Sequence, residues 1–257
     1  MCTVLGLDGG DNRWTGALLT LDTNGNIHTN TLDITNHCCL KYTSIYQQWK
    51  NADVICIDAP IGDRTKTTGF RPCDVSVRKT LTINRNRVFH VPSIQRFQAY
   101  NNNSNITHTQ INNIPDKGVD LSIQAFCNLQ YISAAEDIRK HYSKHSNGIV
   151  IESHPEIVFY RYNNNNLLNK RTIQGRSRRE SILQHHIPNI IWGNIHNIRI
   201  GQTNIDPWCK KRGHDTIDAL AMSLVARAYF LKTAKAITNQ ILPFNQANAS
   251  MVAICVP

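Results

Sequence analysis

The sequence predicts an α/β protein whose sheet begins as an antiparallel meander and continues with parallel strands. Residues 3–8 and 14–21 are apolar runs joined by a glycine pair, a pattern typical of two strands and a tight turn. The Asn24-Gly25 turn signal then leads into residues 27–34, where apolar and polar residues alternate. Strands and turns in this order predict a meander.

Parallel strands are predicted where a short apolar run follows a helix. Residues 42–50 have the apolar spacing of an amphipathic helix and lead into the apolar run 52–58. A second such run, 149–152, follows a long helical pattern over 121–142. A helix between two strands favours a parallel crossover onto the same sheet.

The other segments complete one large domain. Helices are predicted at 71–81 and 170–186. Residues 93–117 are rich in Asn, Thr and Gln and have little periodicity, which predicts a mobile polar insertion at the surface. We therefore expect a single domain over 1–235 with this insertion, followed by a C-terminal extension over 236–257.

The chain is strongly basic. It has 257 residues, a formal net charge of +10 and a pI near 9.3, and 41% of its residues are hydrophobic. The length allows a sizeable core, and the charge favours an acidic partner such as nucleic acid. Its eight cysteines include no Cys-x-x-Cys pair, which argues against a zinc ribbon or a thioredoxin-like motif. Without a signal peptide or membrane-spanning run in the sequence, we expect a reduced, soluble, cytoplasmic protein.

Acidic residues end three of the predicted strands and begin the last predicted helix. Asp8, Asp58 and Glu152 each close a short apolar run. Asp215 and Asp218 stand three residues apart at the start of an apolar-periodic segment, so they share one helix face. Because ligands in open α/β sheets bind at the carboxyl ends of strands, we expect these acids to meet. Several carboxylates in one volume require cations, and Mg²⁺ or Mn²⁺ are the natural candidates.

A basic surface around an acidic pocket suits a nuclease. Two divalent ions about 3.5–4 Å apart can activate a water and stabilise the leaving oxygen of a phosphodiester, while cationic side chains bind phosphates. Two basic segments supply candidate phosphate contacts, although each is equally consistent with a solvated helix face. The substrate-binding candidates in these segments are Arg78, Lys79, Arg176 and Arg179.

Several of the polar residues also have simpler structural interpretations. Asp215 could cap the last helix by accepting hydrogen bonds from its free N–H groups, and Asp58 could cap the turn that follows it. Capping does not explain Asp218, which lies beside the apolar stripe of the helix. Glu156 could stabilise the start of its own helix, and His154 fits a hydrogen-bonded structural histidine better than a ligand or base.

Ordered motifs run through nearly the whole chain. They are Asp8-Gly-Gly with Trp14, Ile57-Asp-Ala-Pro-Ile-Gly62, Arg71-Pro-Cys-Asp-Val-Ser-Val-Arg78, Val88-Phe-His-Val-Pro92, Leu121-Ser-Ile-Gln124, Glu152-Ser-His-Pro-Glu156, the stretch from Lys170 to Arg179, and Asp215-Thr-Ile-Asp-Ala-Leu-Ala221. Together they resemble the predicted RNase H-like nucleases, a family catalogued as domain of unknown function four hundred and twenty-nine. The last motif is also similar to the final helix of RuvC-type Holliday-junction resolvases, in which acids on two strands and this helix bind two magnesium ions.

The resemblance implies an RNase H-like fold, with three antiparallel strands followed by parallel strands and flanking helices. It also implies that Asp8, Asp58, Asp215 and Asp218 bind the metal, with Glu152 as a further catalytic acid nearer the rim. We therefore expect a Mg²⁺- or Mn²⁺-dependent nuclease that hydrolyses phosphodiester bonds in DNA or RNA. The alternatives are a catalytically idle nucleic-acid-binding module of the same fold and an ATP-using enzyme of the related actin-like fold.

Overall fold

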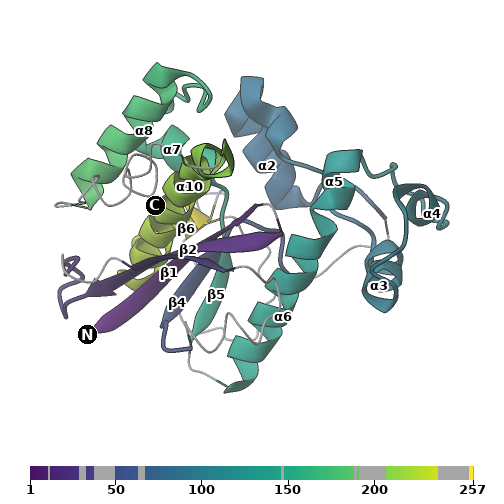
Figure 1. The fold of residues 1–257 in the computed structure, drawn as a ribbon, viewed down its shortest axis with the longest axis horizontal. Helices are drawn as coiled ribbons and strands as arrows, with labels where there is room; N and C mark the ends of the chain where they lie inside the picture. The colour runs from purple at the N-terminus through teal and green to yellow at the C-terminus, as the bar shows by residue number, and fades with distance from the viewer. Residues whose placement is uncertain are drawn as a thin grey trace.

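A mixed sheet lies at the centre of the protein, with helices on both of its faces (Figure 1). The computed structural model describes residues 1–10, 12–28, 33–37, 50–62, 67–145, 148–187, 190, 207–236 and 255–256. The α/β class predicted from the sequence is confirmed. The segment 42–49, predicted to be helical, lies outside the described residues.

The main sheet has five strands in the order β3-β2-β1-β4-β5. They are β1 (Cys2–Gly10), β2 (Arg13–Leu21), β3 (Asp33–His37), β4 (Val54–Ile57) and β5 (Ile149–Glu152). The pairs β1–β2 and β2–β3 are antiparallel, whereas β1–β4 and β4–β5 are parallel. Residues 29–32 of the third strand predicted at 27–34 lie outside the described residues; Ile27 forms an isolated bridge with Leu21, and the ladder described between β2 and β3 extends past the prediction to His37.

The two faces of the sheet bury separate apolar clusters. On one face, Leu5 and Leu7 of β1 pack with Ile138 of α6 (Leu129–His145). On the other face, Val4 and Cys56 pack with the long helix α10 (Pro207–Phe230). Three more helices join the α10 cluster; they are α2 (Pro72–Leu81), α7 (Pro155–Tyr162) and α8 (Ile173–His186). Alternation of side chains along each strand therefore decides which strand residues can reach α10.

Helix α10 (Pro207–Phe230) is longer than predicted. The prediction placed its first turn at Asp215, but the helix begins eight residues earlier, at a proline, which is a favoured first-turn residue. Gly213 lies within the helix and does not end it. Asp215 is therefore not an N-cap, and the capping interpretation of this residue is wrong.

The polar segment 93–117 is folded rather than an irregular insertion, which corrects the prediction. It contains α3 (Ile94–Asn102) and α4 (His108–Asn112), whose apolar side chains Phe97 and Ile111 are buried together. The buried guanidinium of Arg96 lies 3.3 Å from the Asp116 carboxylate and ties the end of the segment to its start. With α5 (Ile123–Cys127) and the first turns of α6, these helices form a lobe beside the sheet (Figure 1).

The helical pattern over 121–142 is interrupted at Asn128, which ends α5 before α6 begins. A 3-10 helix, η1 (Thr82–Arg87), follows α2. Of the predicted extension over 236–257, residues 255–256 form β7 (Cys255–Val256), which pairs antiparallel with β6 (Lys235–Ala236). Among the described residues, no helix combines the length and the apolar character that crossing a membrane requires.

Candidate functional site

Close contact between β1 and α10 positions the acidic residues. A Cβ atom at Gly6 would lie 2.1 Å from the Ala219 carbonyl oxygen, and one at Gly10 would lie 2.8 Å from a carboxylate oxygen of Asp215. Gly6, Asp8 and Gly10 share one face of the strand because side chains alternate. The contacts of Gly6 on α10 extend to Ser223, and the eight residues after Asp215, up to Ser223, span roughly 12 Å, close to the ~13 Å of strand from Gly6 to Gly10. The helix therefore runs antiparallel along β1 and brings Asp218 to Asp8.

The register of β4 brings Asp58 to the same point. Val4 pairs with Val54 and Leu7 with Ile57, and the Asp58 N–H donates to the Leu7 carbonyl oxygen at 2.9 Å. Asp8 and Asp58 therefore leave neighbouring parallel strands side by side. Their carboxyl groups are close enough for each to affect the ionisation of the other.

The carboxyl groups strongly affect each other's ionisation. Burial raises the pKa of Asp8 well above its usual value, and the charges of Asp218, Asp215 and Asp58 raise it further. Burial also raises the pKa of Asp58, with His154 lowering it and Asp218 raising it. The structure thus brings together the four aspartates predicted from the sequence, with Asp8 6% and Asp218 3% exposed. Such a group is electrostatically unfavourable until a cation neutralises it.

Glu152 is not part of this group, which corrects the grouping expected from the sequence. In the β4–β5 register it pairs with Ile57, one residue short of Asp58, so the pleat turns its side chain to the other face. There its carboxylate accepts hydrogen bonds from the Ile61 N–H at 3.0 Å and from the Arg71 guanidinium at 2.5 Å and 2.9 Å.

Arg71 holds a buried ionic network that the sequence prediction missed. Its guanidinium also donates to both carboxylate oxygens of Asp74, at 2.8 Å and 2.9 Å, and to the Ile61 carbonyl oxygen at 3.2 Å. Arg71, Asp74 and Glu152 are each no more than 5% exposed. The sequence did hold a signal for this network: Arg71 and Asp74 stand three residues apart at the start of a helix, and an acid ends a predicted strand. The network fixes the end of β5 against α2.

Cationic side chains already neutralise Asp218. The Lys170 ammonium lies 2.6 Å from one carboxylate oxygen, and Arg179 donates to the other at 3.3 Å. Both cations also pair with Glu156, which accepts from Arg87 as well. Burial would raise the pKa of Glu156, but Arg179, Lys170 and Arg87 lower it to about 2. Lys170 was not among the predicted site residues, because it precedes its helix and no local pattern distinguishes it.

The chemistry of the acidic group suits a hard divalent cation. Asp8, Asp58, Asp215 and Asp218 offer oxygen donors only, which are the ligands that Mg²⁺ and Mn²⁺ prefer. Within the described part of the chain, however, no set of three or more His, Cys, Asp or Glu side chains has an arrangement that could hold a metal ion as it stands. The two carboxylate oxygens of Asp218 are paired instead with Lys170 and Arg179. An ion that binds these acids would take over the neutralising role of Lys170.

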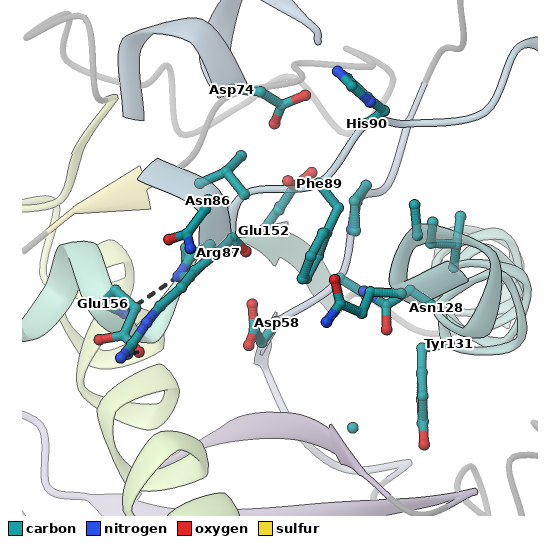
Figure 2. Close-up of a pocket in the computed structure, with 18 of the residues that line it drawn as sticks. Asp58, Asp74, Asn86, Arg87, Phe89, His90, Asn128, Tyr131, Glu152 and Glu156 are labelled. Carbon is teal, nitrogen blue, oxygen red and sulfur yellow. Dashed lines mark hydrogen bonds and ion pairs between the residues drawn. The ribbon is translucent and has the colours of Figure 1, made fainter. Parts of the chain in front are cut away.

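Asp58 brings the acidic group to the edge of a cleft of about 570 Å³ (Figure 2). Asp58 and Lys170 line the cleft from the acidic side. Figure 2 shows Arg87 and Glu156 on one wall, joined by their ion pair, and Asn128 and Tyr131 on the opposite wall. The cleft is therefore bounded by the end of η1, the start of α7 and the α5–α6 corner.

The four predicted substrate-binding residues have different environments. Arg78 donates to the carbonyl oxygens of Arg85 and Val88 and lies 4.1 Å from the centre of the Phe70 ring, so it supports the η1 segment. Arg176 pairs with Glu180 on its own helix at 2.9 Å. Lys79 is exposed. Arg179 is 3% exposed and contacts the acidic group itself, which places it at the site but not on a phosphate-binding surface.

His154 has a structural role. As N-cap of α7, its Nδ1 accepts from the Glu156 N–H at 3.2 Å, and its Nε2 lies 3.4 Å from the Arg87 carbonyl oxygen. It also lines the cleft, as Asp58 does. The predicted structural histidine is thus found at the edge of the site.

The fold and site define an α/β protein with buried carboxylates at the carboxyl ends of two parallel strands, beside a cleft. Residues 6–240 match the family described as Protein of unknown function (DUF429), and the chain belongs to that family. The match includes every residue named above as part of the site. No curated protein and no solved structure matches the chain.

Proposed function

We propose that the protein is a divalent-metal-dependent nuclease with an RNase H-like fold. The observation that carries the proposal is the meeting of Asp8, Asp58 and Asp218 beside a cleft that also presents cations. The strand order, with three antiparallel strands followed by two parallel ones, supports the fold assignment. The net charge of +10 supports a polyanionic substrate.

Each residue of the site has a definite task in this proposal. Asp8 and Asp58 would offer their oxygens from neighbouring strand ends, and Asp218 and Asp215 would offer theirs from α10 once Lys170 gives way to the ion. Mg²⁺ or Mn²⁺, when bound there, would supply Lewis-acid chemistry at a phosphodiester. Arg87, Lys170 and Arg171 line the cleft next to Asp58 and would hold the negatively charged backbone in place.

Cleavage assays with defined metals test the proposal directly. Labelled single-stranded, duplex and branched DNA and RNA would be incubated with Mg²⁺, with Mn²⁺ or with a chelator. We expect cleavage of at least one substrate with either ion and none with the chelator. If no substrate is cleaved with either ion, although the ions bind, the nuclease assignment fails.

A second candidate is a nucleic-acid-binding module that does not cleave. The observation in its favour is the ion pair of Lys170 with Asp218 at 2.6 Å, which neutralises the acidic group without metal. If this pair is permanent, the carboxylates serve only to position basic side chains. Nucleic-acid binding without metal uptake would support this candidate.

Replacing Lys170 with methionine separates the two candidates. Asp218 and Glu156 lose a partly buried cation, so we expect the free energy of unfolding in chelator to fall by about 2 kcal/mol. For a nuclease, Mn²⁺ should restore this loss and bind more tightly to Lys170→Met than to the wild type, as measured by calorimetry and thermal unfolding.

The matched control is Lys117→Met, because Lys117 is exposed and makes no ion pair within the described residues. Its stability and Mn²⁺ affinity should equal those of the wild type. Unchanged Mn²⁺ affinity in Lys170→Met would contradict competition between the ammonium and the ion, and would favour the idle module.

A further inference from the structure

The wall of the cleft that faces the acidic group is built from uncharged polar and aromatic side chains. The cleft-lining residues on this wall are Phe89, His90, Gln124, Asn128 and Tyr131. They come from the segment after η1 and from the α5–α6 corner, and include no Asp, Glu, Lys or Arg among the described lining residues. Burial and the neighbouring Arg78 lower the pKa of His90, which favours its neutral form.

The aromatic rings on this wall are held in place. The Tyr131 hydroxyl accepts a hydrogen bond from the Asn12 N–H at 2.8 Å, and its ring packs edge-on against Trp14 with centroids 5.8 Å apart. Phe89 packs against the apolar cluster of the lobe, and its ring projects into the cleft between Asp58 and Asn128 (Figure 2). Rigid rings facing a cleft are suitable for stacking on a planar ligand.

The amide groups on this wall, by contrast, are open to a ligand as far as the described residues are concerned. The side-chain amides of Gln124 and Asn128 make no hydrogen bond within the described part of the chain, although both residues line the cleft. An amide offers both donors and an acceptor, which matches the edge of a nucleobase. The opposite wall carries Arg87 and Lys170 together with Arg171, which is exposed and has no ion-pair partner among the described residues.

We propose that the cleft takes one unstacked nucleotide of a nucleic-acid strand, with its base on the Phe89–Asn128 wall and its phosphate on the Arg171 wall beside Asp58. The volume of about 570 Å³ lies within the roughly 300–1,000 Å³ typical of small-ligand pockets, so it accommodates a single unit and not a duplex. This inference rests on the proposed function, since it names the substrate class of the same site. A base paired inside a helix cannot reach these rings, so single strands or unpaired positions are the preferred substrates.

Binding without metal tests this inference independently of cleavage. Fluorescence anisotropy in chelator would compare a labelled mixed-sequence single strand with its fully paired duplex. We expect the wild type to bind the single strand about tenfold more tightly than the duplex, because stacking of bases on aromatic rings is available only to the strand. Phe89→Leu keeps an apolar side chain on the lobe and should lose most of this preference, as should Asn128→Ala.

Two matched variants control for the lobe itself. Phe126 packs against the same cluster without lining the cleft, and Asn105 is exposed on the lobe. Phe126→Leu and Asn105→Ala should keep the single-strand preference. Equal binding of strand and duplex by the wild type, or an unchanged preference in Phe89→Leu and Asn128→Ala, would overturn the proposal.

A free nucleoside monophosphate provides the last comparison. It should compete with the strand at least tenfold more weakly than an unlabelled strand does, because it lacks the neighbouring phosphates that add electrostatic contacts. Competition as strong as that of the strand would show that the pocket serves free nucleotides, and would overturn the assignment to a strand. None of these outcomes depends on metal-dependent cleavage, so failure of the proposed nuclease activity would be seen separately.

Discussion

Asp8→Asn is expected to abolish metal-dependent cleavage while leaving the fold intact. Asp8 lies at the centre of the acidic group, where burial and the charges of Asp218, Asp215 and Asp58 all act on it. Asparagine keeps the shape but removes the negative charge that a divalent ion requires. We expect the cleavage rate to fall on the order of a thousandfold, equivalent to a few kcal/mol of transition-state stabilisation.

The same variant should be more stable than the wild type in the absence of metal. The pKa of folded Asp8 lies well above the unfolded value of 3.8, so its contribution to stability is present below pH 3.8 and is lost as the pH rises through the folded pKa. Asparagine does not titrate and avoids this loss at neutral pH. Thermal unfolding at pH 7 in chelator should show a higher midpoint for Asp8→Asn, and Mn²⁺ should stabilise only the wild type.

Asp120→Asn is the matched control, since the side chain of Asp120 is 76% exposed and lies outside the acidic group. Its cleavage rate and stability should equal those of the wild type. Full cleavage activity in Asp8→Asn would remove the central evidence for a metal site at the strand ends.

Gly6→Ala is expected to have the largest effect on stability. A Cβ at this position would lie 2.1 Å from the Ala219 carbonyl oxygen and 2.2 Å from the Ser223 amide nitrogen. Both are backbone atoms of α10, so the whole helix must move away from β1. We expect the free energy of unfolding to fall by about 3 kcal/mol or more, as measured by urea denaturation.

Displacement of α10 should also separate Asp218 from Asp8, so any folded Gly6→Ala protein should bind Mn²⁺ weakly. The control is Gly69→Ala, where an added Cβ meets nothing within 4 Å. Its unfolding midpoint should match that of the wild type. Equal midpoints for Gly6→Ala and Gly69→Ala would show that β1 and α10 are not in close contact.

Local sequence patterns predicted the elements that carry the acidic group. Short apolar runs ending in Asp8 and Asp58 predicted both strands, and the helical pattern in the sequence between them predicted their parallel pairing. Because parallel neighbours end at the same edge of the sheet, the meeting of these two acids followed from the pattern. The shared face of Asp215 and Asp218 followed from their spacing, although the start of their helix did not.

Features that depend on register and on contacts distant in the sequence could not be predicted. Glu152 pairs with Ile57 and not with Asp58, and this difference of one residue turns its side chain to the opposite face. No local signal in the sequence encodes that register. The pairing of Lys170 with Asp218 joins residues 48 apart in the chain. In segment 93–117 the few apolar residues are separated by asparagines, so the helical spacing of a small buried cluster was hidden by composition.

The Arg71 network has a consequence for motion at the cleft. The network adds little net stability, because the cost of desolvating its charged groups offsets much of their attraction. Its hydrogen bonds nevertheless join the turn at Ile61, the start of α2 and the end of β5 into one unit. We therefore expect these three segments to move only together. Any widening of the cleft to admit or release a strand is then expected from hinge movement of the helical lobe or of segment 169–171.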